Sequence, residues 1–162
     1  MDEPPSSQLP SSNLSQRQHW MAVLAKAPWQ SIEQALSQCH DLPSYHYLRQ
    51  PEIGLTMVRG RTGGTGQPFN LGEITLTRSV IQLDETLNDQ VISGFGYVAG
   101  RSHRHAELAA ICDALLQHPN WSDKIYKTVI IPLEQVAKAA RDHQARQIEA
   151  TRVNFFTMQR GE

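Results

Sequence analysis

The sequence is poor in cysteine, in net charge and in long apolar runs, and each shortage removes a class of function. The 162 residues include two cysteines, Cys39 and Cys112, which belong to no CxxC or Cys/His pattern; a zinc finger and a four-cysteine cluster are excluded. A formal charge of −1 gives no general attraction to nucleic acid or acidic membranes. Because there is no signal peptide and no apolar run of about 18 residues, we expect a soluble, cytoplasmic protein.

Signatures of catalysis are missing as well. The chain contains no HExxH metalloprotease motif, no G-x-S-x-G nucleophile elbow and no protein-kinase set. Its carboxylates are scattered and suggest no general acid and base pair. We therefore expect a chain that is not a self-sufficient enzyme.

What the chain does have is a glycine-rich segment between two strand patterns. Residues 59–69 hold four of its ten glycines. Residues 53–58 before this segment and 73–83 after it alternate apolar and polar side chains, which is typical of half-buried strands. The glycines should therefore lie in the loop between two strands, where they tolerate positive φ angles.

Two interpretations of this loop remain open. Successive backbone N–H groups in a glycine loop can form a nest for an anion, and nearby arginines suit phosphate or phosphonate oxygens. Alternatively, the glycines only shape the loop and the arginines are solvated. A Walker A loop is excluded, because the G-K-[ST] ending and the following helix are missing. The candidate anion-binding residues are Arg61, Gly63, Gly64, Thr65, Gly66 and Arg78.

The remaining patterns predict an α+β fold. Residues 45–49 read as a first strand, residues 50–52 as a turn and residues 91–99 as a last strand. With the two strands that flank the glycine loop, these make an antiparallel four-stranded meander.

Helical periodicity surrounds this sheet in the sequence. Residues 15–26 and 29–39 form an N-terminal helical hairpin, the first helix opening with an S-x-x-Q capping box. Ser102 should cap a helix over residues 103–117, and a last helix begins at residue 133. The helix over 103–117 is apolar on nearly every side, so we expect two buried sides, the second against another subunit.

Two short patterns imitate functional motifs. Residues 94–99 match the dinucleotide fingerprint by letter, but these glycines alternate with aromatic residues inside a strand, where they more simply leave room for a close neighbour. His103, His105 and Glu107 suggest a metal site, yet on a helix His105 points away from the other two. We favour a core-facing His105 and a surface pair of His103 and Glu107, with no metal.

One family resemblance is carried by several segments in order: residues 17–21, 63–66, 75–78, 100–101, 105–107, 113–115, 131–133 and 152–158. In these segments the chain resembles the PhnG family, a subunit of the bacterial carbon–phosphorus lyase system for phosphonate use. We expect residues 1–14, rich in Ser and Pro, to be a disordered tail and residues 15–162 to be a single PhnG-like domain.

The resemblance implies a reaction that belongs to an assembly. In this family PhnG works in a hetero-oligomeric core with PhnH, PhnI and PhnJ. PhnI, helped by PhnG, PhnH and the ATPase-like PhnL, displaces adenine from ATP with an alkylphosphonate, which yields α-D-ribose 1-methylphosphonate 5-triphosphate. The nucleosidase chemistry is placed on PhnI and the iron–sulfur chemistry on PhnJ. For this chain the resemblance implies no cofactor of its own, with ATP as a substrate of the complex.

Three hypotheses describe its role. As an accessory subunit, which we favour, the chain buries surplus apolar surface against its partners. In the second hypothesis, the chain also takes part directly in the reaction, and it holds triphosphate or phosphonate oxygens with the glycine loop and Arg61 or Arg78. As a stand-alone module, it binds an anion or nucleotide with Gly63 to Gly66. The expected partner-interface residues are Trp20, His105, Glu107, Ile111, Phe155, Phe156 and Met158.

Overall fold

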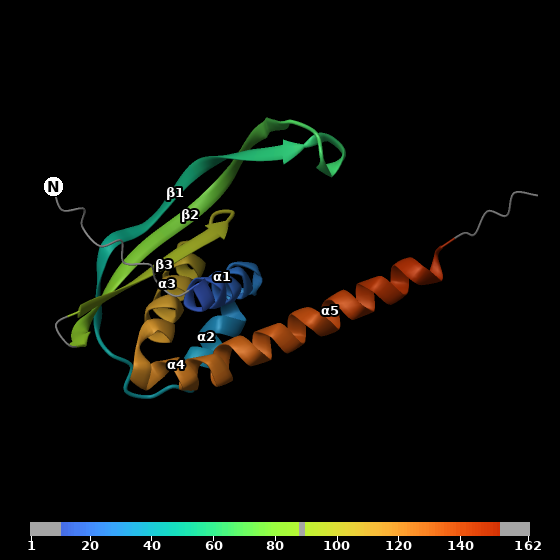
Figure 1. The fold of residues 1–162 in the computed structure, drawn as a ribbon. Helices are drawn as coiled ribbons and strands as arrows, with labels where there is room; N and C mark the ends of the chain where they lie inside the picture. Colours follow the sequence, from blue (N-terminus) through green and yellow to red (C-terminus); the bar gives the residue numbers. More distant parts are fainter. Residues whose placement is uncertain (1–10, 88–89, 153–162) are drawn as a thin grey trace, which may run out of the picture.

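The computed structural model describes residues 11–87 and 90–152, and it confirms the predicted α+β class (Figure 1). Helix α1 begins at Ser11 rather than at the predicted Ser15, while residues 1–10 lie outside the described residues. In chain order the elements are α1 (Ser11–Lys26), α2 (Trp29–Ser37), β1 (Tyr45–Arg61), the 3-10 turn η1 (Thr62–Gly64), β2 (Pro68–Leu87), β3 (Gln90–Ala99), α3 (His103–Gln117), α4 (Pro119–Ile125), the π-helical turn η2 (Tyr126–Ile130) and α5 (Ile131–Ala150).

The sheet is antiparallel with the order β1-β2-β3, so the predicted four-stranded meander is corrected to three strands. The turn predicted at residues 50–52 does not form, and residues 45–61 make one strand whose pairing with β2 is irregular on both sides of Arg49. Pro51 has no backbone N–H to donate. Pro51 lies in the irregular stretch between the paired residues Arg49 and Glu52, and β1 is an edge strand, where proline is tolerated.

Helix α3 is the centre of the fold, and the chain itself covers both of its sides. On one side, Gly94 and Gly96 of β3 lie so close that an added Cβ would collide with the backbone carbonyl of Ala110 or Ala106. These glycines leave room for a close neighbour, as predicted, and that neighbour is a helix. The other side packs against α1, α2 and α4, which corrects the expectation of another subunit there. Its buried neighbours include Leu24, Ile32, Leu36, Ile125, Val129 and Ile130.

Two elements extend away from this body (Figure 1). One is the distal part of the β1–β2 hairpin, residues 53–75, in which no residue is buried. The other is α5, in which Leu133 is buried and the residues from Glu134 onward are exposed or only half-buried. A lone helix of this kind gains little stability from its own hydrogen bonds in water.

Candidate functional site

The glycine segment forms the tip of the β1–β2 hairpin, as predicted. Gly63 and Gly64 have positive φ angles of 61° and 79°, a backbone conformation that favours glycine. The backbone N–H of Gly66 donates to the carbonyl oxygen of Thr62 at 2.9 Å, which closes the turn. Arg61 folds its guanidinium back toward the carbonyl oxygen of Gly66 at 3.5 Å. The tip therefore gathers the predicted loop residues, including Thr65, on an exposed turn.

Arg78 lies elsewhere. It follows Pro68, the first residue of β2, by ten positions, or about 33 Å at the rise of an extended strand. Its Nε donates to Glu52 Oε1 at 2.6 Å, and Arg49 donates to the same oxygen at 2.6 Å. Hydrogen bonds from these two arginines lower the pKa of Glu52. Arg78 and the loop are thus too far apart to hold one phosphate group together.

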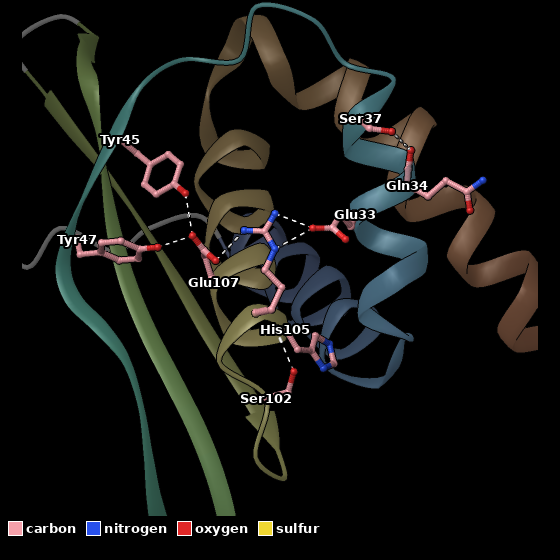
Figure 2. A network of polar contacts seen from close by, with 9 residues as sticks. Glu33, Gln34, Ser37, Tyr45, Tyr47, Ser102, His105 and Glu107 are labelled. Carbon is pink, nitrogen blue, oxygen red and sulfur yellow. Dashed lines mark hydrogen bonds and ion pairs between the residues drawn. The ribbon is translucent and has the colours of Figure 1, made fainter.

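A second polar group, which the sequence did not predict, joins β1, α2 and α3 around Glu107 (Figure 2). Glu107 Oε1 accepts hydrogen bonds from the hydroxyl of Tyr45 at 2.9 Å and from that of Tyr47, and Glu107 Oε2 accepts from Arg104 at 2.8 Å. Arg104 also donates to Glu33 of α2 at 2.7 and 2.9 Å. These four side chains tie the base of β1 to both helices through Glu107.

The charge on Glu107 is held in place by its neighbours. Burial by itself would raise the pKa of Glu107, but hydrogen bonds from Tyr47, Arg104 and Tyr45 outweigh that effect and lower it. Burial and the adjacent Glu107 carboxylate raise the pKa of both tyrosines. At neutral pH the group is therefore a carboxylate between two neutral phenols and a guanidinium. The phenols and the guanidinium already donate hydrogen bonds to carboxylates within the chain.

A cleft of about 300 Å³ opens beside this group, between α2, the segment before β1, and α3. Glu33 and Arg104 stand at its rim, already paired with each other. A mostly apolar cleft of this size can take a small ligand or a partner's side chain, but it offers no free acid and base for chemistry. Its apolar lining includes Leu36, Cys39, Leu42, Leu108, Ile111 and Leu115.

Asp113 is a further residue that the sequence did not single out. It is fully buried in α3, and its two oxygens accept from Arg17 at 3.1 and 2.7 Å, from the indole of Trp20 at 2.9 Å and from the backbone N–H of Phe95 at 2.9 Å. Gln117 donates to it at 3.3 Å. One buried carboxylate thereby joins α1, α3 and the edge of β3. Its signals in the sequence are an acid among the apolar residues 108–116 of α3 and its place in segment 113–115, which carries part of the family resemblance.

The residues expected at a partner interface divide into two groups. Trp20 and Ile111 are 7% and 8% exposed and belong to the chain's own core, while His105 contacts the carbonyl oxygen of Leu24 at 2.8 Å. Glu107 is turned toward its tyrosines. These four offer little free surface to a partner. The predicted residues Phe155, Phe156 and Met158 lie outside the described residues.

The His, Cys, Asp and Glu side chains are dispersed across the described part of the chain. Within residues 11–87 and 90–152, no three His, Cys, Asp or Glu side chains are placed to hold a metal ion together. Glu107 binds Arg104 and the tyrosines, so the predicted surface pair with His103 is not observed. Among the described helices, none has the length and apolar character to cross a membrane.

The fold and its sites define a class of protein. This is a small α+β chain with a self-contained core and two projecting elements, both of which carry exposed apolar side chains, an organisation typical of a subunit.

Comparison with known proteins gives the family. Residues 15–161 match the family described as "Phosphonate metabolism protein PhnG". A curated relative from Rhizobium meliloti (strain 1021), "Alpha-D-ribose 1-methylphosphonate 5-triphosphate synthase subunit PhnG", is 38% identical over 154 residues, which cover 93% of each chain. The chain belongs to the PhnG family of phosphonate-metabolism proteins.

Proposed function

We propose that this chain is a subunit of an α-D-ribose 1-methylphosphonate 5-triphosphate synthase that acts in the cytoplasm. The observation that carries the proposal is the 38% identity to a subunit of that name, extending over 93% of both chains. The structure supports a subunit role, because the hairpin and α5 project from a core that is closed without them.

The proposed reaction transfers the ribose triphosphate of ATP to an alkylphosphonate. A phosphonate oxygen forms a bond to the anomeric carbon of ribose, the bond from that carbon to adenine breaks, and adenine leaves with a proton. The partners proposed for this chain are PhnI, PhnH and PhnJ, with PhnL as an assisting protein. Cleavage of the bond between ribose and adenine is assigned to a partner such as PhnI, because the polar groups described above are paired within this chain.

An assay of adenine release tests this proposal. The partner subunits are prepared with and without this chain, supplied with ATP and methylphosphonate, and followed by chromatography of free adenine. We expect adenine release to depend on this chain, and the chain alone to release none. Equal rates with and without the chain would refute the proposal.

The exposed tip favours one addition, in which the chain also contacts the anionic substrate. Arg61 lies there beside the turn of Gly63, Gly64, Thr65 and Gly66. Arg61→Ala should then leave the complex assembled but raise the ATP or phosphonate concentration needed for half-maximal adenine release. Arg78→Ala, which changes an arginine already paired with Glu52, is the matched control. Unchanged kinetics for Arg61→Ala would exclude the contact. Calorimetry of the lone chain with ATP and methylphosphonate tests the stand-alone binding module.

A further inference from the structure

We propose that residues 53–75, called the distal ribbon, are a docking arm that a different subunit clasps on both faces. This inference rests on the proposed function, because it names the surface through which the chain enters the synthase. The ribbon is the part of β1 and β2 that extends beyond β3, together with the glycine tip (Figure 1).

The register of the two strands places apolar side chains on opposite faces of the ribbon. Leu55 of β1 pairs with Thr75, whereas Ile74 of β2 pairs with Thr56. Directly paired residues share a face and neighbours in sequence alternate, so Leu55 and Ile74 point to opposite sides. Leu55 is 67% exposed and Ile74 is 44% exposed.

Other apolar residues extend these two rows: Val58, which pairs with Gly72, lies on the face of Ile74 and is half-buried. Ile53 and Met57 lie on the face of Leu55, since they pair with Thr77 and Glu73, and both are exposed. An antiparallel sheet ordinarily has one apolar and one solvated face. A ribbon that is apolar on both faces is suited to a partner that encloses it, and a partner lying on one side would leave the other row in water.

Among residues 11–87 and 90–152, no further strand pairs with either edge of the ribbon. The pairing of β3 with β2 begins at Leu76, and the last backbone hydrogen bond on that side joins the N–H of Gly100 to the carbonyl oxygen of Thr75 at 2.9 Å. Beyond this point the ribbon is a two-stranded hairpin, which is marginally stable by itself in water. Enclosure by a partner would supply the contacts that the sheet does not.

The area of the ribbon fits a stable interface. Residues 53–61 of β1 span about 30 Å, and two strands are about 10 Å wide, so the two faces together offer about 600 Å². A stable complex of standard size buries about 800 Å² of each partner. The ribbon therefore supplies most of one side of such an interface.

Charge favours a different polypeptide over a second copy of this one. The ribbon contains Arg59 and Arg61 next to the glycine tip and one carboxylate, Glu73, near its base, so its formal charge is +1. At the base of the hairpin, Arg49 and Arg78 share the single carboxylate of Glu52. Two ribbons laid side by side with their tips together would bring the arginines of one tip against those of the other. A partner with an apolar slot and carboxylates near its end is complementary.

A shortened hairpin is the first test. Replacing residues 56–74 by Asn-Gly joins Leu55 to Thr75 through a two-residue turn and retains the pairing below it. Because no residue from 53 to 75 is buried, the shortened chain should melt at the temperature of the wild type. Co-expressed with the other synthase subunits, it should fail to co-purify with them. Co-purification in wild-type amounts would overturn the inference.

Point variants are the second test and do not shorten the chain. Leu55→Lys and Ile74→Lys each place a charge on one face, and Val91→Lys, at a 57% exposed position of β3 outside the ribbon, is the control. Each ribbon variant should bind the partner at least about ten-fold more weakly than the control, as measured by titration. If only one of the two ribbon variants weakens binding, the partner does not enclose both faces. If the lone chain forms dimers that depend on the ribbon, the partner is a second copy of this chain and the proposal of a different subunit is wrong.

These tests separate the inference from the proposed function. If the wild-type chain is required for adenine release but both ribbon variants assemble normally, the docking surface is wrong and the subunit role stands. If the wild-type chain neither assembles nor affects adenine release, both are wrong.

Discussion

Replacing Asp113 by alanine should lower the free energy of unfolding by about 4 kcal/mol, because this carboxylate is the shared acceptor of three elements. Without it, the indole N–H of Trp20 and the backbone N–H of Phe95 lose the oxygens that lie 2.9 Å away. Each buried donor left without a partner costs about 1–3 kcal/mol. Arg17 adds little, because its side chain is 30% exposed and can turn to water.

The predicted loss is large enough to measure directly. For a chain of this length, 1 kcal/mol corresponds to about 2–4 °C in melting temperature, so Asp113→Ala should melt about 8–16 °C below the wild type. The assay is thermal and urea unfolding followed by circular dichroism. The melting temperature of Asp113→Asn should lie between those of the wild type and Asp113→Ala. The amide retains one acceptor oxygen, but its N–H donors face the donors that the carboxylate accepts from in the wild type.

A matched variant separates this effect from the general loss of an acid in a helix. Asp123 is exposed on α4, and Asp123→Ala should change stability by less than about 0.5 kcal/mol. If Asp113→Ala lies within about 1 kcal/mol of the wild type, the carboxylate does not hold the edge of β3 to α1 and α3, and the account of its role is wrong.

Two further predictions concern the other contacts that hold the sheet to the helices. Gly96→Ala should cost more than about 3 kcal/mol in a urea titration, because its Cβ would meet the backbone carbonyl of Ala106, whereas Gly54→Ala, with open space around it, should be nearly neutral. The pKa of Glu107 is lowered in the folded chain. Its contribution to the free energy of unfolding is therefore fully present above the pKa of the unfolded chain, about 4.3, and is lost as the pH falls through the lower pKa of the folded chain. Glu107→Gln should therefore flatten the fall in stability between about pH 5 and pH 2; an unchanged slope would contradict this.

Much of the architecture follows from local patterns in the sequence. Alternation on both sides of the glycines predicts the hairpin, and Ser102 caps α3 as expected, accepting from the backbone N–H of His105 at 3.3 Å. The strand count fails at Pro51, because a proline is a turn signal in sequence and is also tolerated on an edge strand. Which of the two applies depends on whether a neighbour pairs along that side, and that is a tertiary property.

The site is less predictable than the fold, because its partners are distant in sequence. Asp113 and Arg17 are 96 residues apart, and Glu107 meets Tyr45 across 62 residues. No local spacing connects such pairs. Arg78 is separated from the other candidate anion-binding residues for the same reason in reverse: it is close to the glycine loop in sequence, but an extended strand separates them by about 3.3 Å for every residue.

Apolar content also has to be divided between the core and the surface before it indicates a partner. Ile111 and Trp20 are apolar residues that the chain covers with its own helices, so they carry no information about assembly. Leu55 and Ile74 lie in segments that alternate as half-buried strands do, yet both side chains are exposed. The reason is that β3 ends before it reaches them and no helix lies over this part of the sheet. Alternation predicts a strand, whereas register and sheet width decide whether its apolar row is covered. Among the described strands, the uncovered apolar rows lie on the ribbon, and that is where we propose that a partner binds.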